Sequence, residues 1–163
     1  MKKLPVLGAL ILLFISFLYA ATAQSHNNSA PNMECINCHE GDMQADMVSV
    51  QGIPKNYKPG KVYTMSVVVK SKLESLGDIK GGFALETDKG TLVVKDKKNT
   101  QLIDGFLTHT QEGSHHRKWT FSWKAPEDKS DASISVMAVA SNGDYSSQGD
   151  LVGAASYTIK SGK

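Results

Sequence analysis

Apolar and polar side chains alternate through much of the chain after residue 50, and this alternation limits the possible folds more than any other feature. A period of two places successive side chains on opposite faces, which is typical of β-strands that bury one face. No segment after residue 50 shows the stripe of an amphipathic helix. The alternation is clearest in KVYTMSVVVK at 61–70, KWTFSWKAP at 118–126 and ASISVMAVAS at 132–141. Shorter strands are predicted at 47–50, 83–86, 91–94, 101–109 and 156–159.

Seven or eight short strands separated by turns predict an all-β fold, an antiparallel β-sandwich. The sequence KPG at 58–60 supplies the chemistry of a tight turn before the first long strand. We expect one sandwich domain at 47–160, because the roughly 140 residues after residue 23 suffice for a core without disulfides. Trp119, Phe121 and Trp123 share one face, which we expect in the core rather than as a carbohydrate-stacking platform.

Residues 1–23 have the pattern of a secretory signal peptide. Lys2 and Lys3 precede a run rich in Leu, Ile and Phe, and ATA at 21–23 is an A-x-A-like cleavage site. The alternative is an uncleaved membrane anchor, since the apolar run approaches the roughly 18 residues that begin to span a bilayer. We expect cleavage, a polar linker at 24–34 and a secreted, periplasmic or cell-surface location, which is oxidising. The ending SYTIKSGK predicts no carboxy-terminal anchor.

The charge balance limits the classes of partner. The sequence has 18 Lys and Arg against 16 Asp and Glu, and two of the lysines, Lys2 and Lys3, lie in the signal. The mature chain is therefore close to neutral. Nucleic-acid and membrane-surface binding need a basic stripe. We expect no nucleic-acid partner and no membrane contact after cleavage of the signal.

Both cysteines of the chain lie in CINCH at 35–39, within a predicted haem-attachment segment at 35–46. In c-type haem attachment, two sulfurs about one helical turn apart bind the porphyrin vinyl groups, and the next residue's imidazole reaches the iron. The spacing C-x-x-C-H meets these demands. We predict one covalent haem c per chain, with Cys35 and Cys38 as the attachment residues and His39 as the proximal iron ligand.

Three other interpretations of the motif stay open. A structural zinc site needs four ligands. The motif supplies Cys35, Cys38 and His39, and the pair at 115–116 could complete the site. A thioredoxin-like redox dithiol needs a βαβ context, which the strand pattern does not predict. A disulfide between Cys35 and Cys38 is possible, but its small loop constrains the unfolded chain little. Haem attachment is the interpretation that we favour.

Six segments in order resemble the Reeler (reelin-type) domain, and more closely its prokaryotic secreted versions in which C-x-x-C-H precedes the sandwich. They are CINCHEG at 35–41, YKPGKVYTMSVVV at 57–69, GGFALET at 81–87, LTHT at 107–110, KWTFSWKAP at 118–126 and AVASNGDYSSQGD at 138–150. The resemblance implies an immunoglobulin-like antiparallel β-sandwich, extracellular or surface-associated, preceded by a short helical C-x-x-C-H segment. Many prokaryotic relatives carry a carboxy-terminal anchoring segment, from which this sequence departs.

The identity of the sixth iron ligand separates an electron carrier from a gas-binding or catalytic haem. His109 lies in the THT segment, so the resemblance points to it first as the distal ligand; a hydrogen-bonding strand histidine is the alternative. The two metal-binding residues are then His39 and His109. The other candidates are His26, His115, His116, Met33, Met43, Met47, Met65 and Met137. We expect Met65 and Met137 to fill the core, and the two adjacent histidines at 115–116 to form a polar hairpin tip.

The loop SNGDYSSQGD at 141–150 carries a weaker signal. Asn142, Asp144 and Asp150 offer oxygen ligands to calcium, but their spacing is not that of an EF-hand. We expect a turn rich in Gly, Asn and Asp instead.

Two functional hypotheses follow. The first is a secreted monohaem c-type cytochrome-like protein that passes single electrons to an extracytoplasmic redox partner protein, with an oligomer possible. The second is a non-catalytic extracellular interaction or adhesion module of Reeler type, in which Cys35 and Cys38 are structural. We predict no catalytic residues and no enzyme activity, because the sequence has no Ser-His-Asp set, phosphate-binding glycine loop or paired-carboxylate cleft.

Overall fold

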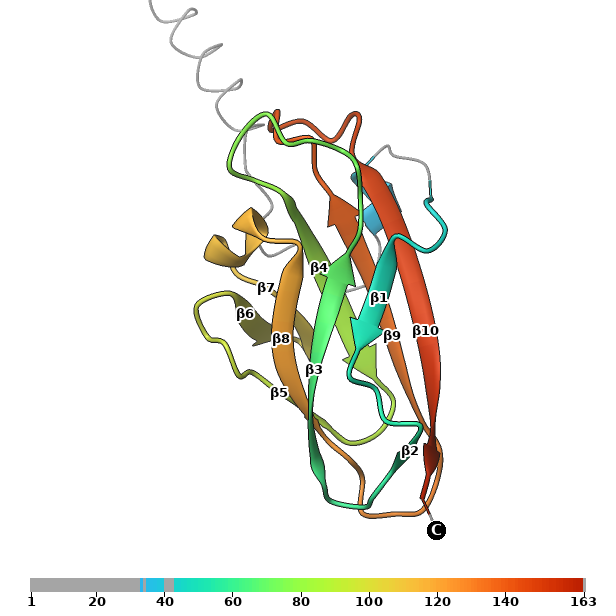
Figure 1. The fold of residues 1–163 in the computed structure, drawn as a ribbon. Coiled ribbons are helices and arrows are strands. Elements are labelled where there is room, and N and C mark those ends of the chain that lie inside the picture. Colours follow the sequence, from blue (N-terminus) through green and yellow to red (C-terminus); the bar gives the residue numbers. More distant parts are fainter. Residues whose placement is uncertain (1–32, 34, 40–42, 163) are drawn as a thin grey trace, which may run out of the picture.

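Two β-sheets pack face to face in the computed structural model of the chain, which describes residues 33, 35–39 and 43–162 (Figure 1). The fold is an all-β sandwich, as predicted, and the segment at 35–39 precedes it in the chain. The predicted signal peptide at 1–23 lies outside the described residues, and so does the predicted linker at 24–34 except for Met33.

The four-stranded sheet is antiparallel throughout, with strand order β1-β3-β8-β5. Its strands are β1 Val48–Gln51, β3 Val62–Val69, β8 Lys118–Lys124 and β5 Thr91–Val93. Met65 of β3 pairs with Phe121 of β8, and Val67 pairs with Trp119. Side chains at directly paired positions share a face. This register therefore directs one face of aromatic and aliphatic side chains toward the second sheet.

The six-stranded sheet has the order β2-β10-β9-β4-β7-β6. Its strands are β2 Asn56–Tyr57, β10 Leu151–Ser161, β9 Ala132–Ala140, β4 Gly81–Thr87, β7 Phe106–His109 and β6 Thr100–Ile103. The long strands β9 and β10 pair over most of their length. β2 pairs in parallel with the end of β10, whereas the other strand pairs of this sheet are antiparallel. The sheet is therefore mixed at one edge.

The core lies between the sheets and contains the predicted aromatic face. Trp119, Phe121 and Trp123 are 1%, 0% and 0% exposed. Ile134 and Val136 of β9 face them from the other sheet and are also fully buried. The expectation that these rings lie in the core is confirmed, which excludes a carbohydrate-stacking platform built from them.

Burial along β9 departs from alternation at one end. Residues 132–137 alternate between buried and partly buried, but Ala138, Val139 and Ala140 are all buried. Ala138 and Ala140 belong to the core between the sheets, while Val139 belongs to a separate apolar cluster. The outer face of the six-stranded sheet is therefore covered at this end of β9.

The prediction of a single strand at 101–109 is wrong, because this segment forms a hairpin of two strands, β6 and β7. Asp104 and Gly105 form its turn with φ of 50° and 88°. Positive φ at both central residues is the type I′ geometry for which Asp-Gly is a preferred pair. The dipeptide was a turn signal in the sequence, and the apolar residues on either side of it suggested one continuous strand.

Helical structure in the described part of the chain consists of two 3-10 turns, η1 Cys35–Asn37 and η2 Glu112–His115. η2 corrects the expected hairpin tip at 115–116: Gly113 and Ser114 are buried, and the Trp119 ring N–H donates to the Gly113 carbonyl at 2.7 Å. Among the described residues, no helix combines the length and apolarity that a bilayer crossing demands.

The core assignment predicts the cost of truncating its central ring. Phe121→Ala should lower the free energy of unfolding by about 3–5 kcal/mol, because it removes a fully buried ring and leaves a cavity. Leu102→Ala is the matched control on an exposed strand position and should change stability by no more than about 0.5 kcal/mol. Urea denaturation of both variants measures the difference. Equal stabilities would contradict the assignment of Phe121 to the core.

Candidate functional site

The cysteine motif forms one helical turn. The backbone N–H groups of Cys38 and His39 both donate to the Cys35 carbonyl, at 3.3 and 2.9 Å. Both cysteines are free, and Cys35 is buried while Cys38 is exposed. The two thiols are thus one turn apart and unbonded, and the imidazole of the motif follows directly.

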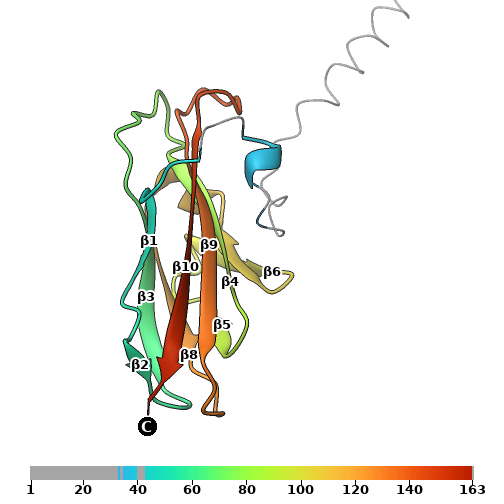
Figure 2. The ribbon, with the colours of Figure 1, turned by 90° about the vertical axis from the view of Figure 1, so that its right-hand side faces the viewer.

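Cys35 attaches the motif to the outer face of the six-stranded sheet. It is 7% exposed and packs with Val139 and Val152, and the partly buried Met137 packs against this cluster. Figure 2 shows η1 outside the sandwich, on the side of the six-stranded sheet from which β6 also projects. η1 therefore covers Val139 at the end of β9, where burial no longer alternates along the strand.

The environment of Cys35 bears on the alternatives for the motif. Burial, supported by the neighbouring Cys38, raises the pKa of the Cys35 thiol above its ordinary value. Reactive redox cysteines have a lowered pKa, because the thiolate is the nucleophile. The Cys35 thiol is therefore not itself an activated nucleophile.

His39 is held by a residue that the sequence analysis had assigned to a turn. Its Nδ1 lies 2.6 Å from Oδ2 of Asp150. The Asp150 side chain is 1% exposed and the His39 side chain 35% exposed. Nδ1–H of a neutral imidazole donates to the carboxylate, which leaves the lone pair on Nε2. In this tautomer, Nε2 of His39 can bind a metal ion, and the side chain is exposed enough to reach one.

The second oxygen of Asp150 is also engaged. Its Oδ1 accepts the backbone N–H of Asn142 at 2.9 Å, which closes the loop at 142–150. The Asn142 side chain in turn donates to Asp144 and accepts the Asp144 backbone N–H. This loop is therefore a turn closed by its own hydrogen bonds, as expected. Its buried carboxylate faces His39 of the cysteine motif.

The structure places His109 at the end of β7, a strand that lies between β4 and β6 in the sheet. Its ring lies against Gly82, where a Cβ would be 2.4 Å from Cε1 and 2.7 Å from Nε2. The Phe83 backbone N–H donates to Nδ1 at 3.2 Å, and the Phe83 carbonyl lies 3.3 Å from the same nitrogen. Nδ1 is either acceptor or donor here, depending on the tautomer. Only the tautomer with Nδ1–H leaves the Nε2 lone pair free.

Electrostatics link the two predicted iron ligands. Burial lowers the pKa of His109, the hydrogen bond with Phe83 opposes this effect, and the charge of His39 lowers the pKa further. His109 is therefore neutral at neutral pH, as a ligand imidazole must be.

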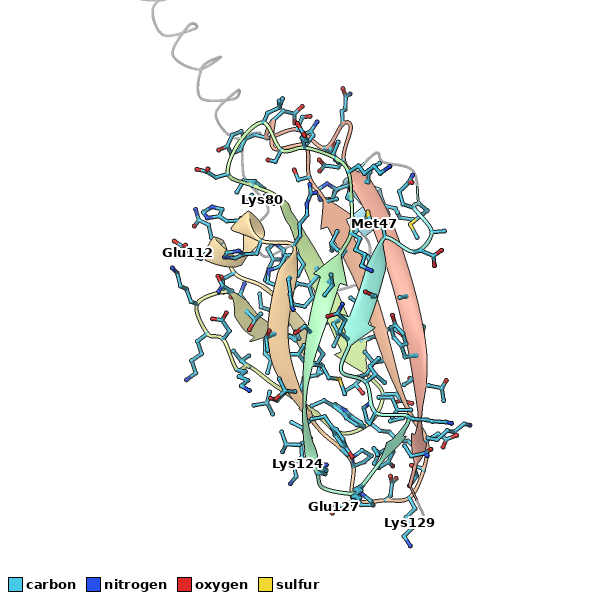
Figure 3. The ribbon with its side chains drawn as sticks, viewed as in Figure 1. Met47, Lys80, Glu112, Lys124, Glu127 and Lys129 are labelled. Carbon is cyan, nitrogen blue, oxygen red and sulfur yellow. The ribbon has the colours of Figure 1, made fainter. Side chains whose placement is uncertain are left out.

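The other predicted candidates fall in different places. Met65 is buried in the core as expected, and so is Met47, at the start of β1 in Figure 3. Met137 faces the Cys35 cluster on the outer side of the sheet, so its expected place in the core is wrong. Met43 is 54% exposed and forms a bridge to Val152.

The remaining histidines lie apart from the motif. His115 and His116 line a hollow of about 550 Å³ with Lys80 and Arg117. His26 lies outside the described residues. In the described ranges, no three His, Cys, Asp or Glu side chains converge on a point that can hold a metal ion. The zinc interpretation through His115 and His116 therefore has no ligand set there.

Sequence reasoning missed two residues of this site, Asp150 and Gly82. Asp150 lies 111 residues from His39 in the chain, and the sequence singled it out only as an oxygen ligand candidate for calcium, not as a partner of His39. Gly82 was visible as one of two adjacent glycines in GGFALET, which left room for a close approach by another group.

No protein family model matches the chain, and no curated protein matches it. The similar solved structures include Reeler domains of F-spondin. The human F-spondin Reeler domain matches with a TM-score of 0.56 at 15% identity, over 76% of this chain and 96% of that one. The Reelin-N domain of F-spondin matches with a TM-score of 0.56 at 15% identity, over 79% and 96% of the two chains. A second fragment of the human domain matches with a TM-score of 0.51 at 18% identity, over 75% and 96%.

Identities this low concern the fold alone. The similarity extends over most of this chain and nearly all of each Reeler domain. The chain therefore has a Reeler-like β-sandwich fold.

Proposed function

We propose that this chain is a monohaem c-type cytochrome-like electron carrier on a Reeler-type β-sandwich, working outside the cytoplasm. The contact between His39 Nδ1 and the buried Asp150 carboxylate is the observation that carries the proposal. Ligand histidines bound through one ring nitrogen usually donate from the other to a carboxylate or carbonyl. A histidine with only a surface role does not require a buried carboxylate from a residue 111 positions away in the chain.

The residues of the motif fit covalent haem c in kind and in arrangement. Cys35 and Cys38 present free thiols one helical turn apart. Val139, Val152 and Met137 supply an apolar floor that excludes water beside Cys35. Ile36 and Met43 are exposed apolar side chains at 55% and 54% next to the same turn, as expected where a large apolar group covers them. When bound, haem supplies one-electron iron chemistry, and the chain sets its ligands and surroundings.

His109 is the proposed distal ligand. Its ring is partly buried against Gly82, and burial lowers its pKa, which favours the neutral imidazole that a ligand must have. For this role, Nδ1–H donates to the Phe83 carbonyl, which leaves the Nε2 lone pair free. Two histidine ligands lower the reduction potential, whereas a methionine raises it. Met137 is the competing ligand on the same face of the sheet.

The proposed setting is extracytoplasmic, in keeping with the signal pattern at 1–23. The proposed partner is another redox protein of the same compartment, which takes or gives single electrons. We propose no enzyme activity. The alternative function is an extracellular interaction module in which Cys35 and Cys38 are structural. In that function, the chain would carry no covalent haem.

Covalent attachment gives the first test. The full chain, co-expressed with a c-type haem maturation system and then denatured, should retain haem absorbance on the polypeptide. Replacing both Cys35 and Cys38 with alanine should abolish it, because no thioether can form. Expression without the maturation system is the control for adventitious haem. Wild-type protein without retained haem would overturn the proposal and favour the interaction module.

The distal assignment gives a second test. His109→Ala should change the low-spin absorption spectrum of the loaded protein, because it removes the distal nitrogen. Gly82→Ala should change it in the same direction, since the new Cβ would displace the ring; this overpacking should also cost about 1–3 kcal/mol of stability. His115→Ala and Met137→Leu are controls expected to leave the spectrum unchanged. An unchanged spectrum in His109→Ala would remove His109 from the iron, and a changed one in Met137→Leu would point to the methionine.

A further inference from the structure

We propose that Asp150 is a positioning residue for the haem iron, and that its carboxylate lowers the reduction potential by acting through His39. This inference rests on the proposed function, because it concerns the same iron ligand. It adds a residue in the loop before β10 that neither the motif nor the strand pattern identified. It also predicts a lower reduction potential than the same site would have without this carboxylate.

The geometry directs the carboxylate at the imidazole. Oδ2 lies 2.6 Å from His39 Nδ1, within the range of a strong hydrogen bond to a charged acceptor. Oδ1 accepts the Asn142 N–H at 2.9 Å, which fixes the rotation of the carboxylate. Asp150 directly precedes β10, whose pairing with β9 holds the backbone at that point. His39 is therefore oriented by a rigid part of the sandwich.

The charge of Asp150 is not neutralised by another partner. Its side chain is 1% exposed, so water screens it little. Among the ion pairs of the described residues, that with His39 is the only one it makes, and no Lys or Arg contacts it. A buried, uncompensated carboxylate interacts strongly with a nearby charge, because the local dielectric constant is low.

The chemical consequence follows from the hydrogen bond. A carboxylate that accepts Nδ1–H draws the proton toward itself and increases electron donation from Nε2. Stronger donation, together with the nearby negative charge, stabilises oxidised iron relative to reduced iron. The reduction potential therefore falls, through the second-shell hydrogen bond and local charge that tune haem sites generally. A backbone carbonyl in the same place would have a weaker effect, since it carries no net charge.

The test compares two aspartates of one loop. In the haem-loaded full chain, Asp150→Asn should raise the midpoint potential. At the wild-type midpoint, the ratio of oxidised to reduced protein should fall about tenfold or more, in the range typical of second-shell changes. Asp144→Asn is the matched control, because Asp144 is exposed and bonds within the loop only. Asp150→Glu keeps the charge and should restore part of the lowering. A potential equal to wild type in Asp150→Asn would overturn the inference.

A second measurement needs neither haem nor a variant. Nitrogen-15 NMR of the wild-type protein prepared without haem maturation should show the His39 proton on Nδ1. A proton on Nε2 would overturn the inference even if Asp150→Asn does not fold. Failure of the chain to take up haem in the covalent-attachment test would instead overturn the proposed function. The two failures are therefore distinguishable, because the NMR result stands on the contact between His39 and Asp150 alone.

Discussion

Burial of the inner faces of two sheets is the interaction on which every other feature of this chain depends. The aromatic residues Trp119 and Phe121 on β8 meet Ile134 and Val136 on β9, and all four are essentially inaccessible to water. This packing, together with their pairing, holds β9 and β10 in place. The outer face of these two strands contains the Cys35 cluster, and the loop between them contains Asp150. The candidate site therefore rests on the outside of the sheet whose inner face forms the core.

The fold was largely predictable because its signals are local. Alternation in 61–70, 118–126 and 132–141 predicted β3, β8 and β9 and the faces that they bury. The hairpin at Asp104 and Gly105 was missed because apolar residues flank a good turn dipeptide on both sides. The short strand β2 was also missed, because two residues carry no period and the pairing with β10 is decided by the rest of the fold.

The candidate site was less predictable because it is assembled over long range. The motif at 35–39 identifies the thiols and His39 by spacing alone, since attachment chemistry is local. Asp150 becomes its partner only after the whole sandwich has folded. His109 was singled out by a family resemblance, and its packing against Gly82 depends on how β7 pairs with β4. Met137 was assigned to the wrong side because a strand pattern does not say which outer face another segment covers.

The arrangement differs from a cytochrome built of helices in how the work is divided. In the proposed cytochrome, a single turn carries the attachment residues, and the sandwich supplies the rest from separate strands and loops. The outer face of β9 and β10 gives an apolar floor, the loop before β10 gives a carboxylate, and the end of β7 beside β4 gives a second imidazole. Peptide mapping by mass spectrometry of the full chain, matured with c-type haem machinery, tests this account most directly. It predicts the mass of one haem on the peptide that contains residues 35–39; an unmodified peptide with both thiols free would contradict it.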